Sequence, residues 1–532
     1  MAVGYEQLSR REFIERGVLA TLAASALAGC AAAPRARPAT ATQPTPARPP
    51  AGPPSAAAWS ALAASLSGQL VLPSDSDYPT ARLVYDMRFE DATPAAIAFC
   101  ASATDVQRVI DFARIHEIRP IPRCGGHSYA GYSTGSGLIV DVTPMSAVTV
   151  SAAAGAPTAT VGAGTRLIDL YAATASAGVL VPGGSCPTVG ISGLALGGGI
   201  GVLGRRYGLT CDAIEALTAV AADSRLLSVS ASSEPDLYWA CRGGGGGNFA
   251  IVTSFELAAH PIPPLALFDI EFPWGAAGDL LGAWQAWIEN APDELWSNCL
   301  LLSAGGSGLL ARSAGVYAGE LSTLSSLIDR LIAAVGTQPV SQFAAANSYL
   351  TAMLIEAGCA DRTLAQCHLA GGAGAGTLPR SAFVAKSAYV ASAFSSPAIA
   401  AAVDAVSSFQ RELPTVGGGL SFDSYGGAIN RVAADATAFV HRDALCQIQL
   451  SGSLAAPIDP ASLRDVQSWL GQTATALAPY CDGQAYQNYI DPTLADWQQA
   501  YYGANLERLV AVKRRYDPDD VFHFAQSIPT GL

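Results

Sequence analysis

The sequence of 532 residues has little charge, methionine or histidine, and each shortage narrows the possible functions. Only 14% of the residues are charged, and the formal net charge is −13. Nucleic-acid binding requires a basic stripe, so a nucleic-acid partner is excluded. The six histidines include no pair spaced i, i+4 beside an acid, and the eleven cysteines include no C-x-x-C pair. The pattern therefore indicates neither a metal site nor a disulfide-stapled small domain.

The first 75 residues are predicted to be an export signal followed by a linker. Ser9–Ile14 (SRREFI) is a twin-arginine signal, and the apolar run after it is shorter than the about 20 residues that span a bilayer. Residues 1–30 end in LAGC, which resembles a bacterial lipobox and predicts a lipid anchor on Cys30. An ordinary cleaved signal with an incidental cysteine is the alternative. Residues 31–75 are predicted to be an Ala/Pro-rich linker. The expected location is periplasmic or otherwise extracytoplasmic.

The length of the chain predicts two or three domains, and its hydrophobic periodicity predicts an α+β fold. Ser102 and Asp105 fit a capping box at the start of an amphipathic helix. Residues 268–272 alternate between apolar and acidic side chains, the pattern of a half-buried strand. An apolar helical stripe at 324–331, closed by Gly336, adds a covering helix. These features predict an antiparallel sheet with helices on one side. Three apolar runs are predicted to form buried strands: 137–142, 217–221 and 250–257.

Two glycine-rich stretches each carry one reactive side chain. Pro182–Gly201 holds eight glycines in twenty positions and contains the nucleophile Cys186. Upstream, His127 follows a glycine pair in Arg123–Ser128 (RCGGHS), and five further glycines occupy 243–247. Glycine is tolerated where backbone lies against a ligand or adopts a positive φ. The two stretches therefore predict a flat, polar cofactor held from two sides.

One match to a known fingerprint is discounted. Gly199, Gly201 and Gly204 have the spacing of the dinucleotide-binding motif, and Asp223 follows about twenty residues later. That motif has to follow a hydrophobic strand, whereas glycines interrupt 189–198 throughout. We therefore interpret the match as a product of the high glycine content.

The order of the motifs is more specific than any single one. RCGGHS at 123–128 is followed by GGSCPTVG at 183–190, by DLYWACRGGGGGNF at 236–249 and by YQNY at 486–489. From residue 88 to residue 529 this order resembles the berberine-bridge-enzyme-like FAD-linked oxidases. The resemblance implies a flavin domain of the vanillyl-alcohol-oxidase type, built from both chain ends around an inserted substrate domain. We expect the flavin domain at 76–264 and 479–532, and the substrate domain at 265–478.

The resemblance also implies roles for individual residues. It implies that FAD is bound covalently twice, through His127 to the flavin 8α-methyl group and through Cys186 to flavin C6. A core histidine and a merely buried cysteine are the alternatives. Val189 matches a position where valine accompanies the use of O2. The other residues expected to contact the cofactor are Arg123, Cys124, Gly125, Gly126, Ser128, Gly190, Gly193, Gly197, Gly198, Gly199, Gly247, Asn248, Val252, Tyr486 and Asn488.

Oxidation of an alcohol needs a base that removes the hydroxyl proton. The resemblance gives this role to Tyr489, the second tyrosine of YQNY, and implies that Gln449 hydrogen-bonds it. Tyrosine has a pKa of about 10, so the base needs support. Gln447 lies on the same polar strand face, where plant relatives often carry lysine, and this departure weakens the expected support. A purely structural Tyr489 is the alternative.

Together these residues predict an enzyme that passes hydride from an alcohol carbon of a sugar or similar polyol to FAD, with O2 reduced to H2O2. One alternative is a dehydrogenase of the same fold that acts on a phenolic, alkaloid-like or other alcohol with another acceptor. Another is a surface binding protein without turnover. The expected partners are a small-molecule substrate and O2, with membrane contact only through Cys30, and no metal is expected.

Overall fold

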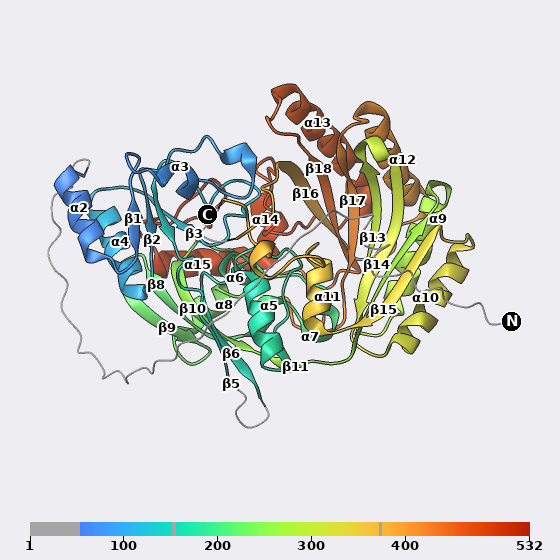
Figure 1. Cartoon of the computed structure of the whole chain (residues 1–532), viewed down its shortest axis with the longest axis horizontal. Coiled ribbons are helices and arrows are strands. Elements are labelled where there is room, and N and C mark those ends of the chain that lie inside the picture. The colour runs from blue at the N-terminus through green and yellow to red at the C-terminus, as the bar shows by residue number, and fades with distance from the viewer. Residues whose placement is uncertain (1–53, 152–155, 372–374, 532) are drawn as a thin grey trace.

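The computed structural model describes residues 54–151, 156–371 and 375–531. The predicted signal peptide, its Cys30 and the first part of the predicted linker lie outside these ranges. Within them, no helix combines the length and the apolar character needed to cross a bilayer. Figure 1 shows two bodies: one holds both ends of the described chain, and the other is a large sheet covered by helices. Each body has its own large cluster of buried side chains.

The predicted linker extends too far toward the C-terminus. Ser55 caps helix α2 (Ala56–Ser65) with its side chain, inside the segment predicted to be a tether. Alanine is the best helix former, and a serine cap stabilises the first turn. The ring of Trp59 lies 4.7 Å from that of Phe112 in helix α4 (Ala103–Ile115). An alanine-rich run therefore folds as a helix here because tertiary contacts cover one of its faces.

Helix α4 begins at the predicted cap, although only half of the capping box forms. Ser102 Oγ accepts a hydrogen bond from the N–H of Asp105 at 3.2 Å. The Asp105 carboxylate does not return to Ser102. It accepts N–H groups from Ser67, Gly68 and Ala101 instead. The acid thereby ties the start of the described chain to α4.

The first body is built on two sheets. The smaller has the strand order β1 (Gln69–Val71), β2 (Ala96–Phe99), β4 (Leu138–Asp141) and β3 (Pro120–Arg123), with β1 antiparallel to β2 and the other pairs parallel. The larger is antiparallel and has the order β5 (Val148–Ser151), β6 (Thr158–Gly162), β10 (Ala250–Ala258), β8 (Ile214–Ala221) and β9 (Leu226–Ser230). The three predicted buried strands are confirmed as β4, β8 and β10.

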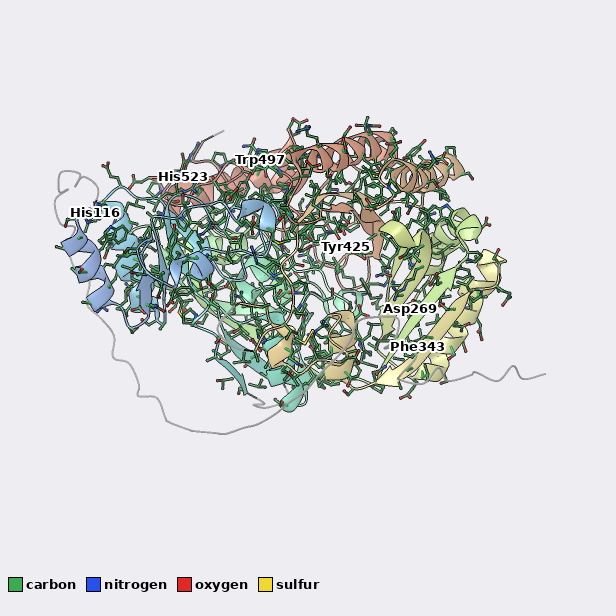
Figure 2. All side chains as sticks on the ribbon, turned by 45° about the horizontal axis from the view of Figure 1, so that its top comes forward. His116, Asp269, Phe343, Tyr425, Trp497 and His523 are labelled. Atoms are coloured by element: carbon green, nitrogen blue, oxygen red, sulfur yellow. A yellow bond between two sulfur atoms is a disulfide. The ribbon has the colours of Figure 1, made fainter. Side chains whose placement is uncertain are left out.

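The second body is an antiparallel sheet of seven strands. Their order is β15 (Ser341–Asn347), β12 (Leu265–Phe272), β14 (Leu309–Tyr317), β13 (Leu295–Ala304), β17 (Gly417–Ser424), β18 (Cys446–Ser453) and β16 (Phe383–Val390). Four helices pack on its apolar face: α9 (Ala277–Glu289), α10 (Leu321–Val335), α12 (Ser396–Glu412) and α13 (Pro460–Leu477). Gly336, with φ of 72°, ends α10 as predicted. Figure 2 labels Asp269 and Phe343, which lie opposite each other on β12 and β15.

Shorter elements complete the two bodies. They are α3 (Tyr78–Ala81), α5 (Leu167–Ser176), β7 (Val179–Leu180), α6 (Ile191–Leu196), α7 (Gly204–Tyr207), α8 (Pro235–Ala240), β11 (His260–Pro261), α11 (Tyr349–Glu356), α14 (Trp497–Tyr502) and α15 (Leu506–Tyr516). The discounted fingerprint at Gly199–Gly204 follows α6 rather than a strand, which agrees with its interpretation as chance. Cys359 and Cys367 form a disulfide, a pairing that the sequence left open.

The C-terminal segment packs back onto the first body through a buried lysine. Lys513 Nζ donates to the carbonyl oxygens of Asn248 at 2.9 Å and Phe522 at 2.6 Å. It also pairs with Asp517 at 2.7 Å, and both side chains are fully buried. The Asn248 side chain in turn accepts the N–H of Ile528 at 2.8 Å. The end of the chain thus fixes the residue that follows the glycines of 243–247.

Candidate functional site

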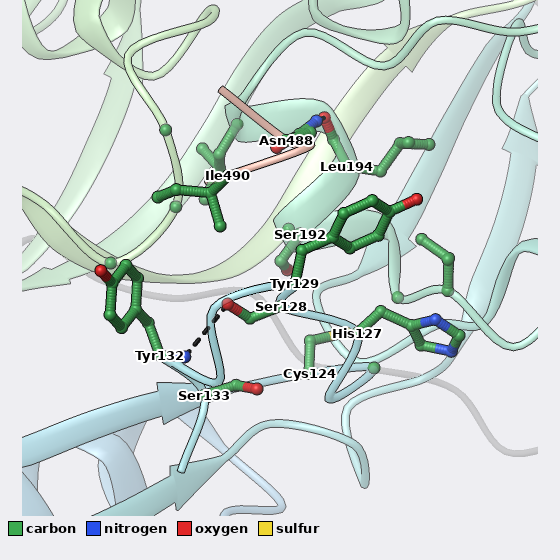
Figure 3. Close-up of a pocket in the computed structure, with 18 of the residues that line it drawn as sticks. Cys124, His127, Ser128, Tyr129, Tyr132, Ser133, Ser192, Leu194, Asn488 and Ile490 are labelled. Carbon is green, nitrogen blue, oxygen red and sulfur yellow. Dashed lines mark hydrogen bonds between the residues drawn. The ribbon is translucent and has the colours of Figure 1, made fainter. Parts of the chain in front are cut away.

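One cavity of about 560 Å³ lies between the two bodies. Its walls come from the loop after β3, the segment 184–196, the glycines at 245–247, strands β16 and β18, and residues 486–490. The predicted flavin-domain motifs and the polar face of the predicted substrate domain therefore meet in one place. Figure 3 shows part of the wall, with His127, Tyr129 and Asn488 labelled.

Most of the residues predicted from the sequence line this cavity. They are Arg123, Cys124, Gly125, Gly126, His127, Ser128, Cys186, Val189, Gly190, Gly193, Gly247, Asn248, Val252, Gln449, Tyr486, Asn488 and Tyr489.

Three predicted cofactor contacts do not line the cavity, and this corrects the prediction. A Cβ added to Gly197, Gly198 or Gly199 would collide with the side chain of Asn488, Phe439 or Thr210, respectively. These glycines allow close packing behind the wall rather than contact with a ligand. The sequence could not separate the two uses, because both require a residue without a side chain.

Other glycines do leave bare backbone against the open space. A Cβ on Gly193 would meet no atom within 4 Å, so this position faces the cavity itself. Gly125 and Gly190 also line the cavity, but a Cβ on either would collide with the opposite loop, so the absence of their side chains allows the two loops to touch. Gly247 has φ of +75° and also lines the wall. The cavity therefore offers a flat surface that a planar ring system can approach closely.

His127 is held on two sides by residues that sequence motifs did not single out for this purpose. Its Nε2 lies 2.8 Å from Thr188 Oγ1. The Tyr85 ring stacks on the imidazole, with centroids 3.9 Å apart and planes 17° from parallel. Burial, followed by the nearby Arg166, lowers the pKa of His127 to about 3. The imidazole is therefore neutral near pH 7 and keeps a lone pair for bonding.

Cys186 lies in the turn that also contains Thr188. Burial raises the pKa of the Cys186 thiol, whereas hydrogen bonds from Thr188 and from the N–H of Val189 lower it. These donors favour the thiolate, which is the nucleophilic form of cysteine. The turn thus offers partial support for a reactive sulfur in the cavity wall.

Gln449 does not hydrogen-bond the predicted base. The Tyr489 ring stacks on that of Tyr129, with centroids 5.1 Å apart and planes 4° from parallel. The amide Nε2 of Gln449 donates to Tyr129 Oη at 3.0 Å. The expected partner is replaced because the stack brings the hydroxyl of Tyr129 within reach of Gln449. Tyr129 lies only two residues after His127, so the RCGGHS motif marked its neighbourhood but not its role.

A half-buried acid that interacts electrostatically with Tyr489 was also missed. Asp423 on β17 lies opposite Gln447 on β18 and interacts electrostatically with Tyr489. Burial raises the pKa of Asp423 to about 6, against a hydrogen bond from Ser421. Burial, then Tyr129 and Asp423, raise the pKa of Tyr489 well above its usual value. Alternation along 417–424 places Asp423 and Ser421 on one strand face, and this signal could have found the acid.

The segment around Tyr489 is anchored to the glycine-rich stretch. Tyr486 Oη accepts the N–H of Gly199 and the side-chain amide of Asn488, both at 2.9 Å. That amide also donates to the Leu194 carbonyl at 3.0 Å, a pair of residues visible in Figure 3. These contacts fix Tyr489 relative to the wall of the cavity that contains Cys186.

Comparisons with known proteins agree with this geometry. Residues 94–230 match the family described as FAD binding domain, and residues 485–529 match the family described as berberine and berberine like. An uncharacterised FAD-linked oxidoreductase of Bacillus subtilis is 32% identical over 87% of this chain and 97% of its own. The structure of BBE-like 1 from Physcomitrella patens covers 89% of this chain and 99% of its own, with 31% identity and a TM-score of 0.80. The structure of glucooligosaccharide oxidase from Acremonium strictum, whose description names a 6-S-cysteinyl, 8α-N1-histidyl FAD, covers 88% and 98%, with 26% identity and a TM-score of 0.77.

Proposed function

Because the chain belongs to the berberine-bridge-enzyme-like family of FAD-linked oxidoreductases, we propose that it oxidises an alcohol carbon of a sugar or similar polyol and reduces O2 to H2O2. One observation carries this proposal: His127, Cys186 and Tyr489 line the same cavity. The carbohydrate class is supported by the likeness to an oligosaccharide oxidase. Val189 in the cavity wall supports O2 as the acceptor.

The cavity fits FAD on the evidence of its own residues. Backbone at Gly193 and Gly247 presents no side chain to the open space, as the approach of a planar ring requires. When bound, FAD supplies the hydride acceptor. His127 and Cys186 would hold it by the two covalent bonds that the description of the oligosaccharide oxidase names for that enzyme. Because Thr188 engages Nε2 of His127, Nδ1 is the nitrogen left to form the bond.

Tyr489 removes the hydroxyl proton of the substrate in this proposal. Its raised pKa keeps the phenol protonated near pH 7, so it can accept a proton only while giving up its own. Asp423, with a pKa of about 6, is mostly a carboxylate at that pH and can receive the second proton. Tyr129 stacks on Tyr489 and restrains its ring. The chain's own residues thus supply both a base and a place for the proton.

We further propose that the protein is exported by the twin-arginine route and anchored through a lipid on Cys30. The support is the SRREFI signal and the LAGC sequence within residues 1–30. Twin-arginine export carries folded proteins, which suits an enzyme that takes up its cofactor beforehand.

A substrate screen tests the proposed reaction. Sugars, other polyols and phenolic alcohols would each be mixed with the protein without O2, and the bleaching of the yellow flavin would be followed. We expect sugars or polyols to bleach it, and H2O2 to form when air is admitted. Bleaching by phenolic alcohols alone would contradict the substrate class. Reoxidation by an added quinone but not by O2 would contradict the acceptor.

Acid precipitation tests the attachment separately from the reaction. The precipitated wild-type protein is expected to stay yellow, and replacing both His127 and Cys186 by alanine is expected to release the flavin into the supernatant. Each single replacement should leave one bond and a yellow precipitate. Free FAD from the wild type would refute the covalent attachment and leave the proposed reaction open to the substrate screen.

A further inference from the structure

The hydroxyl of Thr188 lies between the two side chains proposed to carry the flavin. Thr188 is 3% exposed, and its Oγ1 lies 2.8 Å from His127 Nε2. Burial raises the pKa of the Cys186 thiol, and a hydrogen bond from the same Thr188 side chain opposes this shift. One side chain just behind the cavity wall therefore contacts both nucleophiles.

The chemistry of the groups sets the direction of each hydrogen bond. A hydroxyl has one hydrogen to donate and two lone pairs that accept. The hydrogen bond that opposes the rise in the pKa of the Cys186 thiol is one that the hydroxyl donates, because only donation stabilises the thiolate. Because the hydroxyl gives its one hydrogen to the sulfur of Cys186, it can only accept from Nε2–H of His127. This arrangement leaves the lone pair of Nδ1 available.

We propose that Thr188 is a positioning residue that prepares both flavin-linking side chains through one hydroxyl. It holds His127 in the Nε2–H tautomer, with Nδ1 as the nucleophile, and it stabilises the thiolate of Cys186. The inference rests on the proposed two-bond attachment of FAD. Each attachment replaces one C–H bond of the flavin by a C–N or C–S bond, with loss of the N–H or S–H proton. Two electrons and two protons are released each time, and O2 takes them up as H2O2.

Two neighbours make this role specific to the hydroxyl. Tyr85 stacks on His127 and fixes the plane of the ring, but a stacking contact does not select between the two ring nitrogens. Arg166 disfavours the doubly protonated imidazolium, which has no lone pair, yet it does not determine which nitrogen holds the remaining proton. Selection of the tautomer is therefore left to the contacts with Thr188.

Hydroxyl-free variants of Thr188 test the proposal. Thr188→Val keeps the shape of the side chain, Thr188→Ala provides a second hydroxyl-free variant, and Thr188→Ser keeps the hydroxyl. Thr174→Val is the matched control, since Thr174 is a buried threonine inside α5. Each protein would be purified with its flavin and digested, and the masses of the peptides that contain His127 and Cys186 would give the fraction of each bond. This readout does not depend on turnover.

We expect the doubly attached fraction of purified Thr188→Val and Thr188→Ala to be at least about tenfold smaller than that of the wild type, since a hydrogen bond to a charged or reacting group is worth about that much or more. Thr188→Ser and Thr174→Val should form both bonds like the wild type. Complete double attachment in either hydroxyl-free variant would overturn the role of Thr188. Loss of only one of the two bonds would overturn the claim that Thr188 prepares both His127 and Cys186. An unlinked wild-type protein would instead refute the attachment on which the inference rests.

Discussion

Tyr129 and Tyr489 lie face to face in the cavity, with planes only 4° from parallel. The two phenols differ in their partners, because Tyr129 accepts the amide hydrogen of Gln449, whereas Tyr489 interacts electrostatically with the half-buried carboxylate of Asp423. This difference divides the work between them. In the proposed reaction, Tyr129 restrains the ring of its neighbour, and Tyr489 accepts the proton of the substrate.

The first prediction separates these roles by removing one hydroxyl at a time. Tyr489→Phe is expected to slow flavin reduction by about 10²-fold or more, the usual contribution of a positioned base. Tyr129→Phe keeps the stack and loses one hydrogen bond, so a slowing of less than about tenfold is expected. Rapid mixing without O2 measures both rates. Equal effects would contradict the division of roles, and an unchanged rate in Tyr489→Phe would remove that residue from the mechanism.

The second prediction concerns the pH dependence of the same step. Asp423 loses its proton as the pH rises through about 6 and then becomes able to accept one. Wild-type flavin reduction should therefore accelerate across that range, and Asp423→Asn should lack this step. Glu356, whose pKa burial raises to about 7, interacts with Asp423 and provides the control. Glu356→Gln is expected to retain the acceleration near pH 6, and its loss there would assign the step to Glu356.

The same acid should lower stability at neutral pH. Its folded-state pKa of about 6 lies above the ordinary value of 3.8, so the folded protein holds this proton more tightly than the unfolded chain. The resulting stabilisation is fully present below about pH 3.8 and is lost as the pH rises through about 6. At pH 7 the free energy of unfolding of Asp423→Asn should therefore be about 1–3 kcal/mol higher than that of the wild type. Denaturation across this pH range should show the difference shrinking toward pH 4; a constant difference would contradict the argument.

A third prediction addresses the buried lysine of α15. Lys513→Met leaves the carboxylate of Asp517 buried without its cation and removes the donor to the Asn248 carbonyl. Breaking a buried ion pair from one side costs about 3–5 kcal/mol, and we expect a loss of that size in chemical denaturation. Arg225→Met, which breaks the exposed pair with Asp223, should cost less than about 1 kcal/mol. Similar losses of unfolding free energy in the two variants would show that the buried pair of Lys513 stabilises the fold no more than an exposed pair does.

The fourth prediction tests the anchor. Cys30→Ala should abolish labelling by a radioactive fatty acid and release the protein from the membrane fraction, with flavin reduction unchanged. Replacing Arg10 and Arg11 by lysine should block export instead. Lipid labelling that persists without Cys30 would contradict the lipobox and support an ordinary cleaved signal.

Local sequence patterns predicted the parts of the site that one short segment specifies. RCGGHS and GGSCPTVG identified His127 and Cys186 as cavity residues because the glycines that admit a ligand lie beside each nucleophile. Alternation predicted the half-buried strand at 268–272, and apolar runs predicted the three buried strands β4, β8 and β10. The helix cap at Ser102 was predictable for the same reason, because Ser102 and Asp105 lie within one turn of the helix.

What the sequence did not reveal depends on contacts between distant segments. The hydrogen-bond partner of Gln449 is Tyr129, which lies 320 residues away in the chain. Tyr85 stacks on His127 only because the loop that contains Tyr85 packs against the loop that contains His127. The helix inside the predicted linker likewise needed the side chain of Phe112 to cover Trp59. Glycine content alone did not distinguish a ligand surface from tight packing, as Gly197 illustrates.

The bond from Lys513 to the Asn248 carbonyl has a consequence for the order of events during synthesis. It joins residues 265 positions apart, and its donor lies in α15. A nascent chain still on the ribosome has the glycines of 243–247 but not the helix that locks them. Flavin colour should therefore develop only after α15 has been made, and a stop codon just before α15 should yield a colourless polypeptide although it contains His127 and Cys186.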